Sequence, residues 1–255
     1  MYHYHKYSKP SACTAQIQAA KDALSNIYKS YDSLKYLTFD VSYTYDSDTL
    51  YGDFTHDAIN GTYTMNGKKA FYKLGDIDFM QNESFLIAVY HKDKFMIVSD
   101  PQQVNAGGYL PMRAQMDSLF NMAESHYTVN LSTGSGNMGS TLSTITLAAN
   151  DSLAQFKTYV ITYDSSTNYL KSLQYSFIGR ADNFEAYDTI TDTARRRLLN
   201  VPRKKQLTIR FLKYRFDNIS KEIYDENNYI FYEDDKYKPV SKYSDYTLYY
   251  TKTRK

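Results

Sequence analysis

The chain has 255 residues, with 30 basic and 28 acidic side chains, a net charge of +2 and a hydrophobic fraction of 42%. The balance of charges excludes the strong basic stripe typical of nucleic-acid-binding proteins, while the apolar fraction is sufficient for a folded core. The single cysteine, Cys13, excludes an internal disulfide and a cysteine-based metal cage. No apolar run of about 18 residues occurs, so no transmembrane helix is predicted.

The N-terminal segment, residues 1–14, is predicted to be a disordered tail, because it is polar and lacks the apolar stretch of a signal peptide. Within it, small residues at Ser11 and Ala12 precede Cys13, as they precede the lipidated cysteine of a bacterial lipobox. The apolar stretch that a lipobox needs upstream is missing. Two interpretations remain open: a lipoprotein whose start is replaced or misassigned, or an ordinary cysteine in a tail.

A long amphipathic helix is predicted first, because apolar side chains recur at steps of three and four residues. This stripe consists of Ile17, Ala20, Leu24, Ile27, Tyr28, Tyr31 and Leu34. The period then changes to two over residues 37–45, which predicts a half-buried strand. Asp46-Ser47-Asp48 predicts the end of that strand, and residues 49–57 predict the return strand.

Two asparagine–glycine pairs, Asn60-Gly61 and Asn66-Gly67, predict turns, since both residue types tolerate positive φ. A turn is also predicted at residues 91–94, between the two strands of a hairpin. The strands of this β-meander are predicted over residues 62–65, 69–74, 84–90 and 95–99.

The second half of the chain begins with a predicted helix around Met112–Ala123, where apolar residues again recur at helical spacing. Strands follow, and the Ser-, Thr- and Gly-rich residues 132–143 predict either a flexible loop or a loose edge of the sheet. The predicted strands cover residues 127–131, 144–148, 158–164, 170–178 and 206–214. Two tyrosine-rich stretches, residues 229–232 and 243–250, predict extra strands near the C-terminus.

Residues 179–205 contain two basic runs, Arg195–Arg197 and Arg203–Lys205. A basic run is most often a solvated face or loop, and this is one interpretation. The other is contact with anionic lipid headgroups or with an acidic partner.

No group of residues predicts catalysis or a cofactor. His3 and His5 lie two apart in the tail and would bind a metal only weakly, whereas His56, His91 and His126 stand alone and lack the spacing of a zinc site. The acidic group that includes Glu226, Asp234 and Asp235 is predicted to serve solubility. We therefore expect a protein that is not an enzyme and that has no metal site and no cofactor.

The apolar strand faces are the predicted binding surface, because 28 tyrosines and no tryptophan occupy this chain and many tyrosines alternate along strands. A sheet face too large for the predicted helices to cover marks a binding site, whereas the alternative is that these side chains simply fill the core. The predicted lipid-contacting residues are Phe39, Val41, Tyr43, Tyr63, Met65, Phe71, Val89, Met96, Val98, Met116, Leu119 and Phe120.

The order of elements resembles the LolA-like family of lipoprotein carriers. The resemblance is carried by Ile27–Tyr31 running into Phe39–Tyr43, by Gly61–Met65, by the hairpin Ala88–Pro101, and by Tyr163–Leu173. It implies an open half-barrel with helices on its concave face. It also implies binding of a lipid or an acylated protein on the periplasmic side of a bacterial envelope or at its outer membrane.

The sequence thus predicts an α+β, mainly β fold, in which a curved antiparallel sheet forms one half-barrel domain over residues 15–255. We expect a monomer that binds a lipid or an acylated protein, that contacts a membrane surface and that binds no nucleic acid. The alternative is an envelope structural protein whose half-barrel is filled by its own side chains and whose partner is a protein.

Overall fold

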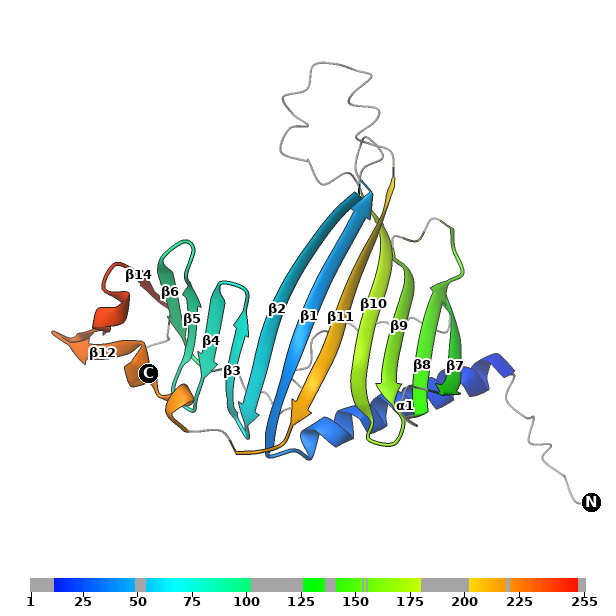
Figure 1. The fold of residues 1–255 in the computed structure, drawn as a ribbon, viewed down its shortest axis with the longest axis horizontal. Helices are drawn as coiled ribbons and strands as arrows, with labels where there is room; N and C mark the ends of the chain where they lie inside the picture. The colour runs from blue at the N-terminus through cyan, green and yellow to red at the C-terminus, as the bar shows by residue number, and fades with distance from the viewer. Residues whose placement is uncertain are drawn as a thin grey trace, which may run out of the picture. The chain divides into compact units, whose positions relative to one another are not determined.

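The computed structural model describes residues 12–48, 54–101, 126–135, 141–152, 154, 156–179, 202–218 and 221–251. Within these ranges the chain is mainly β, with one α-helix and short 3-10 helices (Figure 1). The predicted helix at residues 112–123 lies outside the described residues, as do Arg195–Arg197. The helix α1 covers Ala12–Asp32, so it begins inside the range predicted as a tail.

The strand bounds follow the predicted alternation except at β2, which joins the strands predicted at residues 49–57 and 62–65, and at β4 and β13, which were not predicted. They are β1 Tyr36–Asp48, β2 Phe54–Asn66, β3 Lys69–Leu74, β4 Ile77–Gln81, β5 Leu86–Tyr90, β6 Phe95–Ser99, β7 Tyr127–Ser135, β8 Thr141–Ala149, β9 Phe156–Asp164, β10 Tyr169–Gly179, β11 Arg203–Arg215, β12 Ile230–Glu233, β13 Lys236–Pro239 and β14 Thr247–Tyr250. The 3-10 helices are η4 Lys221–Tyr224, η5 Glu226–Asn228 and η6 Ser241–Tyr243.

Twelve of these strands follow one hydrogen-bonded order, β14-β6-β5-β4-β3-β2-β1-β11-β10-β9-β8-β7, and β12 pairs with β13 separately. Among the described strands no ladder joins β14 to β7, so the order is open. The predicted antiparallel sheet is confirmed, and at its edge β14 runs parallel to β6. The chain enters β14 beside Lys94, where β6 begins, and the Thr247 amide donates to the Lys94 carbonyl. Both strands therefore start at the same end.

The chain divides into two compact units, and each is described by itself. The first contains Met1–Tyr28, Tyr45–Thr55 and Ala114–Leu207, and the second contains Lys29–Thr44, His56–Arg113 and Thr208–Lys255. The strands β1, β2 and β11 and the helix α1 contribute residues to both.

In the first unit, antiparallel strands β7 to β10 bury one face, since burial alternates along β8 with a period of two. Ile145 and Leu147 are fully buried on this face. Helix α1 lies against β7, where the Leu131 amide donates to the Gln16 side-chain oxygen at 2.9 Å (Figure 1). The apolar stripe predicted for this helix is buried at Ile17, Ala20, Leu24 and Ile27.

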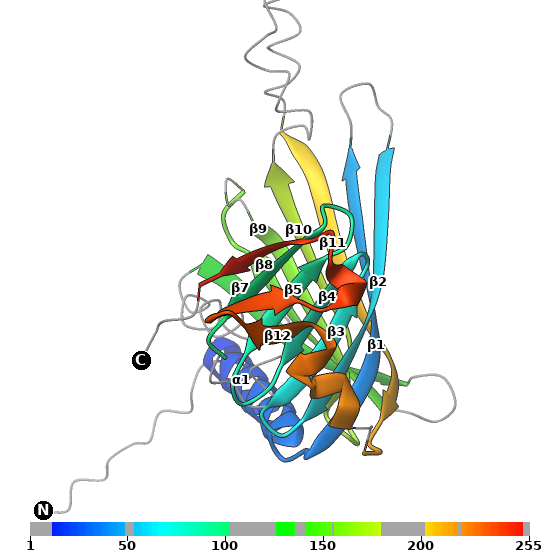
Figure 2. The same ribbon diagram turned by 90° about the vertical axis from the view of Figure 1, so that its left-hand side faces the viewer.

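In the second unit, the C-terminal segment, residues 221–250, crosses the strands β3 to β6 (Figure 2). Its Tyr229, Ile230 and Tyr243 pack on one face of these strands in a single buried cluster. The strand side of that cluster consists of Met80, Ile87, Val89, Met96 and Val98, with Phe71 at its margin. The C-terminal segment thus covers this face.

Of the two predicted asparagine–glycine turns, only Asn66-Gly67 is a turn, with a Gly67 φ of 60°. Asn60-Gly61 lies inside β2, and this prediction is wrong. An added Cβ at Gly61 would stand 2.5 Å from the Lys73 carbonyl oxygen on the neighbouring strand. Close approach of two backbones, and not a turn, requires the glycine at this position.

Strand pairing extends past polar residues at three further places. β1 continues through Asp46–Asp48, where Ser47 is fully buried, so the predicted end of this strand is wrong. β7 and β8 occupy both ends of residues 132–143, pairing Ser132 with Thr144 and Thr133 with Ser143, and β7 is an edge strand, as the alternative of a loose edge predicted. Arg203–Lys205 opens β11 and is not a loop, with Lys204 exposed and Lys205 buried.

Candidate binding site

The first unit contains a cavity of about 550 Å³ at the ends of four strand segments. It is formed by the end of β1, the beginning of β9, the end of β10 and the beginning of β11. Ligand sites of this size, mostly apolar with a few polar groups, are typical of small-molecule binding. The lining residues are Asp46, Asp48, Lys157, Ser176, Phe177, Ile178, Lys204, Lys205 and Gln206.

Lys205 is the most buried charged residue of this cavity, with 8% of its surface exposed. Its stem passes over Gly179 at the end of β10, where an added Cβ would stand 3.1 Å from the Lys205 Cε. Its Nζ lies 5.9 Å from the centre of the Tyr45 ring, within the range of a cation–π contact. The glycine and the tyrosine therefore hold a lysine stem that would otherwise extend into solvent.

Aromatic rings back the apolar side of the cavity. Phe177 lies 6.0 Å from Phe156, which in turn lies 5.6 Å from Tyr159. Burial raises the pKa of Tyr159, and the nearby Tyr127 raises it further. Burial likewise raises the pKa of Tyr175, with a further rise from Tyr159. These tyrosines therefore stay neutral at physiological pH, so this wall carries no charge.

The second unit carries a row of eight aromatic rings, one from each of eight neighbouring strands. Ring centres of successive members lie 4.2 to 6.4 Å apart, close to the spacing of the strands themselves. In order the row is Phe211, Phe39, Tyr63, Tyr72, Phe79, Tyr90, Phe95 and Tyr249.

Exposure increases along this aromatic row. Phe39 is fully buried, Phe79 and Phe95 are half-buried, and Tyr249 is 54% exposed. At the buried end, the Tyr31 hydroxyl of α1 lies 2.5 Å from the Tyr214 hydroxyl next to Phe39. Several of the ring pairs are stacked face to face, so these rings bury much of their apolar surface against one another.

The predicted lipid-contacting residues divide between the two faces of the second unit. Phe39, Tyr63 and the alternating Val41, Tyr43 and Met65 share the face of the aromatic row. Phe71, Val89, Met96 and Val98 belong to the opposite face, beneath the C-terminal segment. The remaining three, Met116, Leu119 and Phe120, lie outside the described residues.

The sequence predicted that His91 stands alone, but the structure gives it two polar partners. Its Nε2 lies 3.0 Å from Asp78 Oδ2, and its Nδ1 lies 3.1 Å from the Tyr246 hydroxyl. Asp78 and His91 face each other across the β4–β5 hairpin, whereas Tyr246 belongs to the chain leading into β14. The histidine thus connects the C-terminal segment to the sheet.

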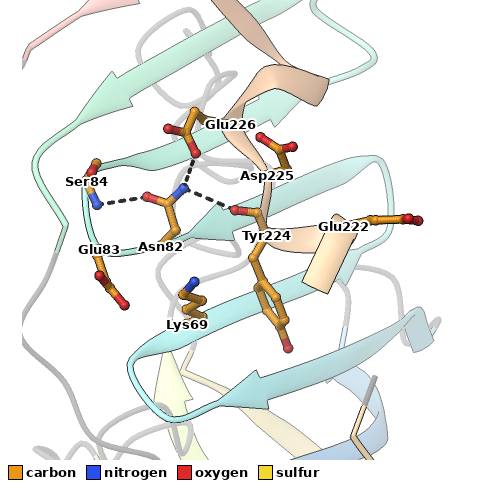
Figure 3. Close-up of a pocket in the computed structure, with 8 residues that line it drawn as sticks. All are labelled: Lys69, Asn82, Glu83, Ser84, Glu222, Tyr224, Asp225 and Glu226. Carbon is orange, nitrogen blue, oxygen red and sulfur yellow. Dashed lines mark hydrogen bonds between the residues drawn. The ribbon is translucent and has the colours of Figure 1, made fainter. Parts of the chain in front are cut away.

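A second, polar pocket of about 390 Å³ lies beside the 3-10 helices of the second unit (Figure 3). Asn82 is at its centre. Its side-chain oxygen accepts from the Ser84 amide, and its Nδ2 donates to the Tyr224 carbonyl and, at 2.7 Å, to Glu226. Glu226 therefore has a structural contact beyond the solubility role predicted for it. Burial raises the pKa of Tyr224 to about 12.

The residues of the 550 Å³ cavity were not among the predicted contacts. Two signals in the sequence point toward them: the alternation over residues 170–178 and the basic run Arg203–Lys205. Neither signal shows that the two strands lie side by side, because their pairing joins distant parts of the chain. No group of three metal-ligating side chains is found in the described part of the chain. In the same part, no helix is both long and apolar enough to span a membrane.

Comparisons with known proteins give similarity to solved structures alone. Neither a protein-family model nor a curated protein matches the sequence. An uncharacterized conserved protein from Thermus thermophilus is similar over 92% of this chain and 100% of its own, with 7% identity and a TM-score of 0.43. A LolA superfamily protein from Nitrosomonas europaea is similar over 80% and 97%, with 10% identity and a TM-score of 0.30.

MucB, solved in a Pseudomonas aeruginosa MucA/MucB complex, is a third similar structure. The similarity covers 81% of this chain and 60% of the solved chain, with 9% identity and a TM-score of 0.35. Identities and TM-scores this low do not carry a function from these proteins to this one.

Proposed function

We propose that the chain is a non-enzymatic binding protein whose 550 Å³ cavity takes the apolar chain of an amphiphile, such as an acyl chain. The observation that supports this function is the cavity itself, with Phe177 and Ile178 at its apolar wall. Burial of apolar surface contributes about 25 cal/mol per Å², so a chain seated on this wall gains affinity without any covalent step. The function agrees with the carrier class that the sequence resemblance implies, a half-barrel with helices on its concave face.

The test is a titration of the purified protein with a fluorescent fatty acid, accompanied by native mass spectrometry. We expect saturable binding of one ligand per chain. Ile178→Asn replaces an apolar contact by a neutral amide that retains water, and we expect binding at least tenfold weaker, equivalent to about 1.4 kcal/mol. The matched control is Leu212→Asn, because Leu212 is an exposed residue of β11 outside the cavity. We expect this variant to bind with unchanged affinity. Absence of any uptake by the unaltered protein would refute the proposal.

A second candidate function is recognition of a protein partner by the C-terminal segment. Two tyrosines that adjoin Tyr237 are exposed, Tyr232 by 61% and Tyr250 by 41%, and the Tyr232 ring centre lies 5.1 Å from that of Tyr237. Tyr250 also stacks on Tyr237 with ring centres 5.2 Å apart, which extends the patch. Clustered exposed tyrosines are typical of energetically important positions in protein interfaces.

This candidate is tested by affinity capture from cell extract with a Tyr232→Ala, Tyr250→Ala double variant. We expect a partner retained by the unaltered chain to be lost by the double variant and kept by Ile59→Ala, which truncates an exposed residue of β2. A partner retained equally by all three proteins would argue against the C-terminal patch. For both candidates we propose the bacterial envelope as the compartment, which fractionation of cells would check.

A further inference from the structure

The charged side chains around the 550 Å³ cavity are not evenly balanced. Three lysines line it, Lys157 from β9 and Lys204 and Lys205 from β11, against two aspartates from β1. Three positive and two negative charges leave the lining with an excess of one positive charge. In a partly desolvated site with apolar walls, this excess favours an anionic group over a neutral one.

Lys205 is the lysine best placed to act on a ligand, because it is the buried one. A buried ammonium is costly unless an anion or a set of hydrogen bonds compensates it. Its stem is positioned by Gly179 and Tyr45, both of which belong to strand ends that form the cavity. A ligand anion at this point would add to the compensation of a charge that the fold already holds in place.

The apolar and cationic residues are adjacent along the strands. Phe177 and Ile178 are followed at once by Gly179, which contacts the Lys205 stem. A ligand whose apolar chain lies on the phenylalanine and isoleucine therefore has its end group within reach of the lysines. This is the arrangement that an amphiphile with a charged head requires.

We propose that the cavity selects amphiphiles with an anionic head, a carboxylate or a phosphate, through Lys205 with Lys157 and Lys204 at its margin. The selection rests on the proposed function, because it concerns the head of the ligand whose chain the cavity takes. Asp46 and Asp48 oppose the head electrostatically, so they limit the affinity and disfavour heads of higher negative charge.

The experiment compares three probes that share a twelve-carbon chain: dodecanoate, dodecyl phosphate and dodecanol. Each probe displaces a neutral fluorescent lipid from the purified full-length chain below its critical micelle concentration. We expect both anions to bind at least tenfold more tightly than dodecanol, with the ratio of the two anions distinguishing a carboxylate site from a phosphate site. Raising the salt concentration should narrow the gap between the anions and dodecanol.

The variants Lys205→Met and Lys157→Met test the assignment to these lysines, and Lys171→Met is the matched control. Lys171 lies on β10 in the same unit, 43% exposed and outside the cavity lining. We expect Lys205→Met to weaken dodecanoate binding at least tenfold and to leave dodecanol binding unchanged. If Lys205→Met fails to fold, Lys157→Met gives the same comparison with a smaller loss of about threefold.

The outcomes separate the two proposals. Equal binding of dodecanol and the two anions by the unaltered protein would overturn the selection of an anionic head and leave the acyl-binding function standing. No binding of any probe would overturn the acyl-binding function itself. Equal losses for Lys171→Met and the cavity variants would also overturn the assignment to the cavity lysines.

Discussion

Replacing Phe39 by alanine should lower the free energy of unfolding by about 3–5 kcal/mol, the cost typical of removing a buried aromatic side chain and leaving a cavity. Phe39 is fully buried and contacts Tyr63, Phe211 and Tyr214 with ring centres 5.2 to 5.6 Å away. A typical domain is stable by only about 5–15 kcal/mol, so this loss is a large fraction of the total stability. Urea denaturation followed by circular dichroism measures this loss.

Tyr249→Ala is the internal control, because Tyr249 is the exposed end of the same aromatic row. With 54% of its surface in solvent, its truncation should change stability by no more than about 0.5 kcal/mol. Phe95→Ala, at a half-buried position next to Tyr249, should fall between the two. Similar losses for all three variants would contradict the graded burial of the row.

The strands could be predicted because alternation is a local pattern, and it located β3 and β6 at their observed bounds. Features that depend on pairing between distant segments could not. Gly61 has the local pattern of a turn, yet its position is decided by the Lys73 carbonyl of the next strand. Lys205 has the local pattern of a solvated loop, yet Gly179 on β10 and Tyr45 on β1 receive its stem.

The sequence predicted an apolar binding surface, but it did not predict which residues line the cavity. Alternation correctly placed Phe39, Val41 and Tyr63 on one apolar face, because side chains two apart on a strand point the same way. It could not tell which face of β5 and β6 would be covered. Val89 and Met96 are covered by Tyr229 and Tyr243, which belong to the C-terminal segment, and no pattern within β5 or β6 indicates that contact.

A single charged substitution in the C-terminal segment should break its contact with β5 and β6. Ile230 is 1% exposed within the buried cluster of the C-terminal segment. Ile230→Asp would place a carboxylate among Met80, Ile87 and Tyr229, and an uncompensated buried charge typically costs about 3–5 kcal/mol. Because β12 and β13 pair with each other and not with β3 to β6, we expect this part of the segment to detach, while β3 to β6 stay paired and β14 stays paired with β6.

Hydrogen exchange read out by mass spectrometry distinguishes this local opening from general unfolding. In Ile230→Asp, amides of β12 and β13 should exchange much faster than in the unaltered chain, while those of β2 and β3 keep their protection. The neighbouring Phe231→Asp is the matched control, since Phe231 is 39% exposed and its carboxylate would remain in water. Equal exchange in the two variants would show that Ile230 does not anchor the segment. Loss of protection in β2 and β3 as well would show instead that the C-terminal segment is required for the strands beneath it, since Met80, Ile87, Met96 and Val98 would lose their packing against Tyr229, Ile230 and Tyr243.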